Sequence, residues 1–332
     1  MAQRLRIAIN GFGRIGRTIL RIVEQGKAGQ DFEVVCINEL EPLDICAYLF
    51  QYDSVFGPFS GTVSSEPGVL NVNNRGIPFH SETDISKLDL AGVDLLLECT
   101  GMANTREVAE RGLKAGAKTV LISGPSDAAD RTVVLGANEG QIGDHKIISN
   151  ASCTTNALAP LMKILDEAFG IVSGHMTTIH CYTGSQPTID KPRGDLARSR
   201  AGALSMVPTT TSAQRLIDEV LPHLAGRLEG RAVRVPTASV SAIDLTIQTR
   251  EPASVAAVNK LLSEAAQNSE IIGWIEQPLV STDLRARPES IVMSGLETSV
   301  SVGGLLRVFG WYDNEWGFST RMLDMARLMG GR

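Results

Sequence analysis

A glycine-rich turn between an apolar strand and an amphipathic helix is the feature that most constrains the fold. The apolar run at 5–9 predicts a buried strand, and apolar residues at helical spacing from Ile15 to Val23 predict a helix. Between them the glycines are spaced Gly-x-Gly-x-x-Gly, which allows a tight turn and a close backbone approach to a pyrophosphate at the helix N-terminus. The predicted dinucleotide-binding residues are Gly11, Phe12, Gly13, Arg14, Ile15 and Gly16.

A second apolar run at 34–37 ends just before Glu39. An acidic residue about 20 positions beyond the turn accepts hydrogen bonds from a ribose diol and repels a 2′-phosphate, which favours NAD over NADP. The simpler alternative is that the glycines serve only a turn and that Glu39 caps a helix.

The rest of the chain predicts two domains. Apolar runs at 94–97, 119–122, 132–135 and 146–148, with a helical pattern at 106–115, indicate an α/β domain over 1–150 with a doubly wound parallel sheet. Two-residue alternation at 239–248 and a helix at 254–266 indicate an α+β domain over 151–314 with a largely antiparallel sheet. A last helix within 315–332 is expected to pack back on the first domain.

Composition excludes several classes of function. The net charge of −6, without a long run of one sign, is not that of a protein with a dedicated nucleic-acid or anionic-membrane partner. No apolar stretch approaches the ~20 residues of a membrane span, and no signal peptide is recognised. Five cysteines without a Cys-x-x-Cys pair or zinc spacing predict no metal site and a cytoplasmic, reducing location.

A polar string at 149–156 predicts a nucleophile. It precedes apolar residues at helical spacing, so it indicates a capped helix start with Cys153 at the positive end of the helix dipole, where the thiolate is favoured. Cys36 and Cys99 lie in apolar runs instead, as buried structural cysteines do. Among five histidines, His180 at the end of an apolar strand is the best partner for Cys153.

A basic loop at 191–200, a hydroxyl-rich segment at 208–212 and Arg234 form a third feature. Arginine forks with hydroxyl groups suit the phosphate oxygens of a small substrate. A solvated or subunit-contacting loop is an equally good interpretation of this charge run.

Four blocks in this order, at 10–17, 149–156, 180–183 and 311–317, closely resemble the glyceraldehyde-3-phosphate dehydrogenase family, which also contains the erythrose-4-phosphate dehydrogenases. The resemblance covers essentially the whole chain. It implies a cytoplasmic homotetramer of glycolysis, with a Rossmann domain and a catalytic domain in each subunit. The implied oxidoreductase converts D-glyceraldehyde 3-phosphate, NAD and inorganic phosphate into 1,3-bisphosphoglycerate through a thioester on Cys153, with His180 as its partner.

The resemblance also implies roles for individual residues. Thr183 and Arg234 correspond to binders of the substrate's own phosphate, and Ser152, Thr211 and Arg198 to binders of the attacking phosphate, with Thr154 and Ser212 added from the same segments. Cofactor-binding positions implied in this way are Glu39, Thr100, Gly101, Ser123 and Asn314, the last for the nicotinamide carboxamide.

Two alternatives stay open at this point. Erythrose-4-phosphate dehydrogenase would use the same cysteine and histidine, with water rather than phosphate resolving the thioester. A protein of another class would keep the fold as a non-catalytic NAD-binding or interaction protein. The chain also departs from many relatives: Ala157 stands where they have a second cysteine four residues after the nucleophile. We therefore expect little inactivation of Cys153 through an intramolecular disulfide.

Overall fold

The computed structural model describes residues 4–26 and 30–331, and the chain divides into two compact units. Unit 1 comprises Met1–Val133, Glu139–Ala151 and Ser319–Arg332. Unit 2 comprises Val134–Asn138 and Ser152–Phe318. Both ends of the chain therefore contribute to unit 1.

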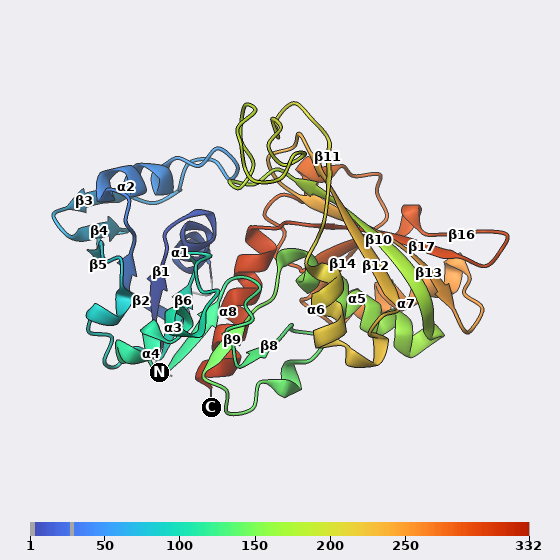
Figure 1. Cartoon of the computed structure of the whole chain (residues 1–332), viewed down its shortest axis with the longest axis horizontal. Coiled ribbons are helices and arrows are strands. Elements are labelled where there is room, and N and C mark those ends of the chain that lie inside the picture. Colours follow the sequence, from blue (N-terminus) through green and yellow to red (C-terminus); the bar gives the residue numbers. More distant parts are fainter. Residues whose placement is uncertain (1–3, 27–29, 332) are drawn as a thin grey trace. The chain divides into compact units, whose positions relative to one another are not determined.

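Unit 1 is built on a sheet with the strand order β3-β4-β5-β2-β1-β6-β7-β9-β8 (Figure 1). All pairs from β5 to β8 are parallel, and only the β3-β4-β5 edge is antiparallel. Its strands are β1 (Leu5–Asn10), β2 (Phe32–Asn38), β3 (Val63–Glu66), β4 (Val69–Val72), β5 (Arg75–His80), β6 (Leu95–Glu98), β7 (Thr119–Ile122), β8 (Arg131–Thr132) and β9 (Ile147–Ser149).

Helices connect these strands and complete the core of unit 1. Side chains from β1, β6, β7 and the helix-bearing segment 103–117 form one apolar cluster. The α-helices are α1 (Arg14–Gln25), α2 (Leu43–Gln51), α3 (Arg106–Ala109), α4 (Arg111–Lys114) and α8 (Trp316–Gly330), of which residues from Ser319 onward belong to unit 1.

The strand order reverses at β1, which has β2 on one side and β6 on the other. Loops that leave the carboxyl ends of these strands run in opposite directions and leave a crevice between them, where open α/β sheets bind ligands. The predicted glycine turn follows β1, and Glu39 follows β2. The topology thus places both at the switch point.

Unit 2 is built on a sheet with the order β11-β12-β10-β13-β17-β15-β14, with β16 paired to β17. The β10-β12 and β14-β15 pairs are parallel and the others antiparallel. The strands are β10 (Ile171–Cys181), β11 (Val207–Thr209), β12 (Leu228–Val235), β13 (Ser241–Thr249), β14 (Ile272–Ile275), β15 (Ile291–Ser294), β16 (Ser299–Val300) and β17 (Leu306–Tyr312).

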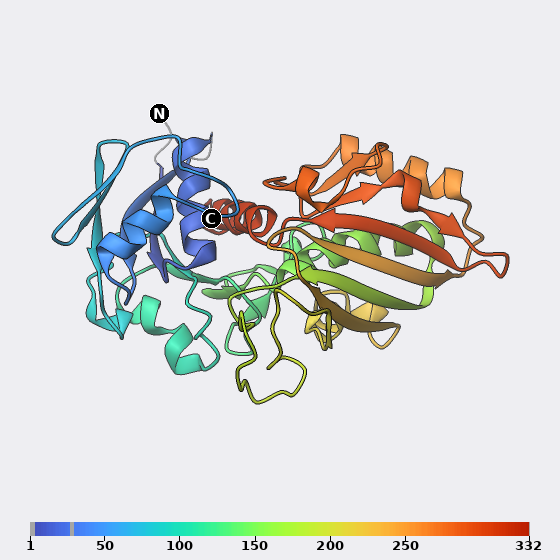
Figure 2. The same ribbon diagram turned by 90° about the horizontal axis from the view of Figure 1, so that it is seen from above.

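Three helices pack on this sheet. Helix α5 (Cys153–Phe169) contacts β10, β13 and β15, α6 (Ala213–Val220) contacts β12, and α7 (Val255–Gln267) contacts β14. Figure 2 shows α7, in orange, lying along the strands. Short 3₁₀ turns complete the two units: η2 (Ile85–Lys87), η3 (Glu139–Gln141), η4 (Pro222–Leu224), η5 (Ser281–Leu284) and η6 (Gly295–Glu297). No helix in the described part of the chain has the length and apolarity needed to cross a membrane.

The predicted fold class is confirmed, and two predicted elements need correction. The apolar run at 132–135 is not a strand beyond Thr132, because Asn138 Oδ1 accepts a hydrogen bond from the Val134 N–H and turns the chain there. The helix predicted at 106–115 is interrupted at Glu110, whose ψ of −11° departs from regular helical geometry.

Candidate active site

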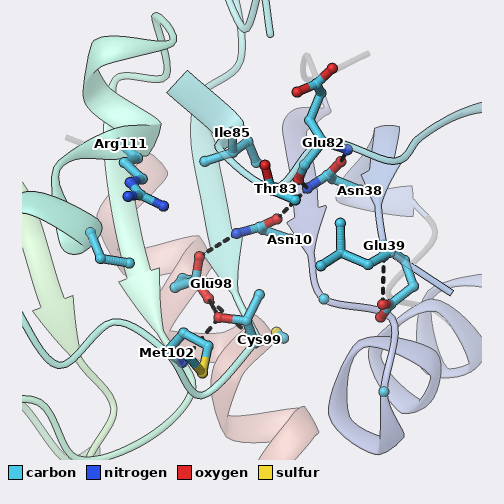
Figure 3. Close-up of a pocket in the computed structure, with 15 residues that line it drawn as sticks. Asn10, Asn38, Glu39, Glu82, Thr83, Ile85, Glu98, Cys99, Met102 and Arg111 are labelled. Atoms are coloured by element: carbon cyan, nitrogen blue, oxygen red, sulfur yellow. Dashed lines mark hydrogen bonds between the residues drawn. The ribbon is translucent and has the colours of Figure 1, made fainter. Parts of the chain in front are cut away.

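A cavity of about 580 Å³ lies at the carboxyl ends of β1, β2 and β6 in unit 1 (Figure 3). Of the predicted cofactor residues, Gly11, Gly13, Glu39 and Thr100 line it directly. The sequence did not identify its other lining residues, which are Asn10, Asn38, Leu40, Glu82, Thr83, Ile85, Glu98, Cys99, Met102, Val108 and Arg111.

The glycines of the turn are required sterically, and they fit a pyrophosphate. Gly11 has φ +91°, and a Cβ there would lie 2.8 Å from the backbone of Cys99 and Thr100. A Cβ on Gly16 would lie 2.2 Å from the Gly11 carbonyl oxygen. Gly13, the N-cap of α1, has open space around its Cβ position and no side-chain cap. The first amides of α1 are thus accessible to an anion.

Glu39 ties the glycine turn to the end of β2. One carboxylate oxygen accepts a hydrogen bond from the Phe12 N–H at 2.7 Å, and the other accepts from the Leu40 N–H at 2.7 Å. The oxygen that meets Leu40 also accepts from the Glu41 N–H at 3.2 Å, so the oxygen that meets Phe12 is the one that keeps a lone pair for a ribose hydroxyl. Glu82 and Glu98 also line the cavity, against one cation, Arg111. This charge balance suits a ribose diol better than a 2′-phosphate.

A buried polar chain forms the floor of the cavity. Asn38 Nδ2 donates to Asn10 Oδ1 at 2.8 Å, and Asn10 Nδ2 donates to Glu98 Oε2 at 2.5 Å. Glu98 Oε1 accepts from the Thr100 N–H at 2.9 Å and from the Thr100 hydroxyl. These contacts link three neighbouring strands at their ends. The signal in the sequence was a polar residue closing each of three buried apolar strands.

The remaining predicted cofactor residues do not line this cavity. The Phe12 ring packs on Phe50 and Phe79, with centroids 6.0 and 6.3 Å away, and Arg14 forms an ion pair with Asp53 at 2.5 Å. Ile15 and Gly16 lie within α1, Gly101 takes φ +72° after Thr100, and Ser123 hydrogen-bonds the Cys99 side chain. Asn314 belongs to unit 2.

The predicted nucleophile and its partner meet within unit 2. Ala151 adopts φ +55°, which turns the chain out of β9, and Ser152 then caps α5 by accepting a hydrogen bond from the Thr155 N–H at 3.1 Å. Cys153 is therefore the first residue of α5, as predicted. Its Sγ lies 3.6 Å from Nε2 of His180, near the end of β10.

Both groups of this pair are neutral in the free protein. Burial, with the nearby Arg234 charge as a smaller cause, lowers the pKa of His180 to about 4. Burial also raises the pKa of the Cys153 thiol, against the opposing effects of Arg234 and of hydrogen bonds from Thr154. Desolvation therefore opposes the thiolate that a helix N-terminus favours.

Arg234 lies beside His180 because β10 and β12 pair in a register that puts the two residues opposite one another. Its Nη1 is 2.6 Å from His180 Nδ1 and 3.1 Å from the Cys181 carbonyl oxygen. That carbonyl is also 2.7 Å from His180 Nδ1. The two contacts compete for Nδ1, since the Cys181 carbonyl needs a proton on it and Arg234, which only donates, needs it unprotonated. In the tautomer whose Nδ1 proton is donated to the Cys181 carbonyl, Nε2 is left as an acceptor facing the thiol.

Four of the residues predicted to bind phosphate lie between the end of β10 and the start of α6. Thr183 Oγ1 lies 2.8 Å from Ser185 Oγ, just beyond β10. Arg198 donates to the hydroxyls of Thr209 and Thr210 at 2.6 and 3.0 Å, which holds its guanidinium beside the segment that carries Thr211 and Ser212. Thr211 Oγ1 accepts from the Ala213 N–H, and Ser212 occupies the N-cap position of α6 without a side-chain cap.

Thr154 is placed differently from the other predicted phosphate binders. It is buried, and its hydroxyl lies 2.9 Å from the hydroxyl of Tyr312, which also meets Thr178 at 2.7 Å. The Tyr312 ring stands edge-on to His180, with centroids 6.0 Å apart. Tyr312 thus joins α5, β10 and β17 behind the catalytic pair, and the sequence pattern did not single it out.

Comparisons with known proteins give the same assignment for both units. Residues 5–106 match the family model described as the NAD binding domain of glyceraldehyde 3-phosphate dehydrogenase, and residues 152–314 match the model of its C-terminal domain. The chain belongs to the glyceraldehyde-3-phosphate dehydrogenase family. The predicted family and the predicted cofactor, NAD, are thereby confirmed.

Curated relatives resemble the chain over nearly its full length. Proteins named glyceraldehyde-3-phosphate dehydrogenase are 47% identical in Xanthobacter flavus and 46% identical in Cereibacter sphaeroides, each alignment covering 98% of both chains. A protein of the same name from Pseudomonas aeruginosa is 46% identical over 97% of both chains. These names favour the triose phosphate reaction over the erythrose alternative.

Proposed function

We propose that the protein oxidises D-glyceraldehyde 3-phosphate with NAD and inorganic phosphate to 1,3-bisphosphoglycerate, through a thioester on Cys153. The observation that carries this proposal is the pair of Cys153 Sγ and His180 Nε2, 3.6 Å apart, in which the half-buried thiol at the start of α5 faces a buried imidazole. A protein that only binds NAD has no need of a thiol aimed at an imidazole. Unit 1 is the NAD-binding domain of this enzyme and unit 2 its catalytic domain.

The neutral pair sets the first step. Sγ of Cys153 adds to the aldehyde carbon while its proton passes to Nε2 of His180, which is unprotonated at neutral pH because its pKa is about 4. The carbonyl oxygen that becomes negative is stabilised by the protonated imidazole and by the backbone N–H of Cys153. The product of this step is a hemithioacetal on Cys153.

Oxidation and phosphate transfer follow on the same sulfur. When bound, NAD supplies the acceptor for the hydride that leaves the hemithioacetal carbon, so that a thioester remains. A phosphate oxygen then attacks the thioester carbonyl, the C–S bond breaks, and the acyl phosphate leaves. The departing sulfur takes back the proton that His180 received in the first step, and the proton of the attacking phosphate is released to the medium, which restores the neutral pair.

Individual residues receive roles within this reaction. Arg234 and Thr183 bind the phosphate of the substrate, and Arg198, Thr211 and Ser152 bind the attacking phosphate, with Thr154 and Ser212 as their neighbours. Support comes from the guanidinium of Arg198 beside Thr209 and Thr210. Glycines of the turn bind the pyrophosphate, Glu39 the ribose diol, and Asn314 the carboxamide of nicotinamide. Thr100, Gly101 and Ser123 shape the cofactor site.

We also propose a homotetramer in a reducing cytoplasm. Large apolar side chains are exposed on the loop 189–206 and at the 302–305 turn, which is what subunit contacts would cover. All five cysteines are free thiols, as a reducing compartment requires. Sedimentation of the purified protein at a mass other than that of four chains would contradict the tetramer.

The test is the reduction of NAD and of NADP with glyceraldehyde 3-phosphate and with erythrose 4-phosphate, each with and without inorganic phosphate. We expect phosphate-dependent NAD reduction with the triose. Cys153→Ser should abolish it, and His180→Asn should leave a reaction slower by about 10²-fold or more. Phosphate-independent oxidation of erythrose 4-phosphate, with little turnover of the triose, would overturn the proposal.

A further inference from the structure

Three buried polar residues lie together behind the catalytic pair, and the mechanism does not use them all. Cys181 ends β10 directly after His180, Ser241 begins β13, and Asn314 follows β17. Their exposed fractions are 1%, 1% and 7%. Sheet pairing brings the three segments together, because β10 pairs with β13 and β13 pairs with β17.

Two donors converge on one atom of Asn314. The Cys181 thiol donates to Asn314 Oδ1 at 3.1 Å, and the Ser241 hydroxyl donates to the same oxygen at 3.3 Å. Ser241 Oγ in turn accepts a hydrogen bond from the Cys181 N–H at 3.1 Å, which fixes its position. Burial raises the pKa of the Cys181 thiol to about 12, so it carries its proton at neutral pH.

This arrangement favours one orientation of the Asn314 amide. If the amide were flipped, the hydroxyl and the thiol would have to turn and accept from its NH₂ group, and a thiol sulfur is only a weak acceptor. In the observed orientation, Nδ2 of Asn314 donates no hydrogen bond to any residue that the structure describes. The atom is also not fully buried, since it is not among the buried polar atoms that lack a partner. Nδ2 is therefore available to an acceptor from outside the chain.

We propose that Cys181 is a positioning residue, which together with Ser241 holds the Asn314 amide so that Nδ2 is presented as a donor to the carboxamide oxygen of nicotinamide. The inference rests on the proposed function for the identity of the acceptor. Cys181 acts through Asn314 and touches neither the cofactor nor the reacting atoms. Cys181 therefore strengthens binding of the nicotinamide end of the cofactor and does not affect binding of the adenosine and pyrophosphate groups.

The test compares the dissociation constants of NAD and ADP-ribose, since ADP-ribose lacks the nicotinamide ring. In Cys181→Ala, binding of NAD should weaken about threefold relative to binding of ADP-ribose, as expected for one lost hydrogen bond. Cys181→Ser is the matched control, because its hydroxyl replaces the thiol as donor. Its ratio of the dissociation constants of NAD and ADP-ribose should stay within about twofold of the parent ratio. Equal weakening of both ligands in Cys181→Ala would mean a merely structural role and would overturn the inference.

A double-mutant cycle separates this inference from the proposed function. Asn314→Ala should itself weaken NAD relative to ADP-ribose, by about tenfold, and adding Cys181→Ala should then change the ratio no further. If Asn314→Ala leaves the ratio unchanged, the proposed nicotinamide contact is wrong. If Asn314→Ala changes the ratio while Cys181→Ala and Ser241→Ala do not, the contact of Asn314 with nicotinamide is supported, but the positioning role of Cys181 is wrong.

Discussion

At the scale of single residues, burial is the largest influence on the pKa values of the two proposed catalytic residues, Cys153 and His180. An exposed imidazole would be partly protonated near its ordinary pKa of 6.5 and could not accept the thiol proton. Burial of His180 lowers that pKa to about 4 and removes this competition at neutral pH. The same burial raises the pKa of Cys153, so the proton stays on sulfur until a substrate draws the electron pair away.

Burial of His180 also makes folding stability depend on pH. Because the pKa is lower in the folded than in the unfolded chain, the unfolded chain binds more protons between pH 6.5 and pH 4. The stability contributed by the neutral imidazole is fully present above pH 6.5 and is lost as the pH falls toward 4. Urea unfolding at pH 7 and pH 5 should show that the parent loses about 2 kcal/mol more than His180→Asn does. Equal losses would contradict this assignment.

Oxidation of the thiols gives a second prediction at this scale. Ala157, one turn into α5 from Cys153, has no sulfur, and Cys181 is buried with its thiol donated to Asn314. We expect peroxide to convert Cys153 to sulfenic and then sulfinic acid without forming an internal disulfide. Mass spectrometry of digested protein measures this, and a dominant disulfide between Cys153 and Cys181 would refute it.

At the scale of elements, serine caps fix where two helices of unit 2 begin. Ser152 caps α5 and Ser254 caps α7, each by accepting a backbone N–H three residues on, at 3.1 and 3.2 Å. The two caps differ in what stands beside them: Ser152 precedes Cys153, the proposed nucleophile, while α7 carries none of the proposed site residues.

This difference predicts different consequences for the same substitution. Ser152→Ala and Ser254→Ala should each lower the free energy of unfolding by ~1 kcal/mol in urea. Ser152→Ala should also reduce kcat/KM for inorganic phosphate by about tenfold. Ser254→Ala serves as the control and should retain the parent value. An unchanged kcat/KM for phosphate in Ser152→Ala would show that Ser152 does not bind the attacking phosphate.

Elements with strong local patterns were predictable, and the contacts between them were not. Apolar runs identified β1, β2, β6, β7 and β9, and helical spacing identified α1, α5, α7 and α8. The weakly apolar hairpin region β3 to β5 carried no comparable signal. The end of β8 depends on one side chain, Asn138, that captures the Val134 N–H, and periodicity does not report such a bond.

In the candidate site, too, local sequence patterns were predictable and contacts between distant elements were not. Cys153 was predictable because a helix start is readable from neighbouring residues. The contact of Arg234 with His180 depends on the register of β10 against β12, which are separated by about 50 residues of chain, and register is not encoded locally. Tyr312 and the Asn10–Asn38–Glu98 chain likewise gain their significance only when distant strands pair.

At the scale of the whole molecule, each unit has a core of its own. Met325 on α8 is fully buried in unit 1, and Leu262 on α7 is fully buried in unit 2. Each core can therefore be loosened separately by removing one large side chain, at a cost of ~2–5 kcal/mol.

Calorimetry should resolve this independence. We expect Met325→Ala to lower the temperature of the thermal transition that NAD raises. NAD at 100 times its dissociation constant adds ~2.7 kcal/mol to the free energy of unfolding of the unit that binds it. Leu262→Ala, the matched variant, should lower the other transition. A single transition that responds equally to both substitutions and to NAD would show that the units unfold as one.

The division of unit 1 between the two ends of the chain determines when it can finish folding during synthesis. Most of its strands leave the ribosome before unit 2 does, yet the buried side chains of α8 that complete its core emerge only after unit 2; they are Met322, Leu323, Met325, Ala326 and Met329. Unit 2 is fully synthesised once Phe318 has been added. Unit 1, whose strands are synthesised before most of unit 2, is thus completed only after unit 2, and its apolar strands wait without their final partner while unit 2 is made.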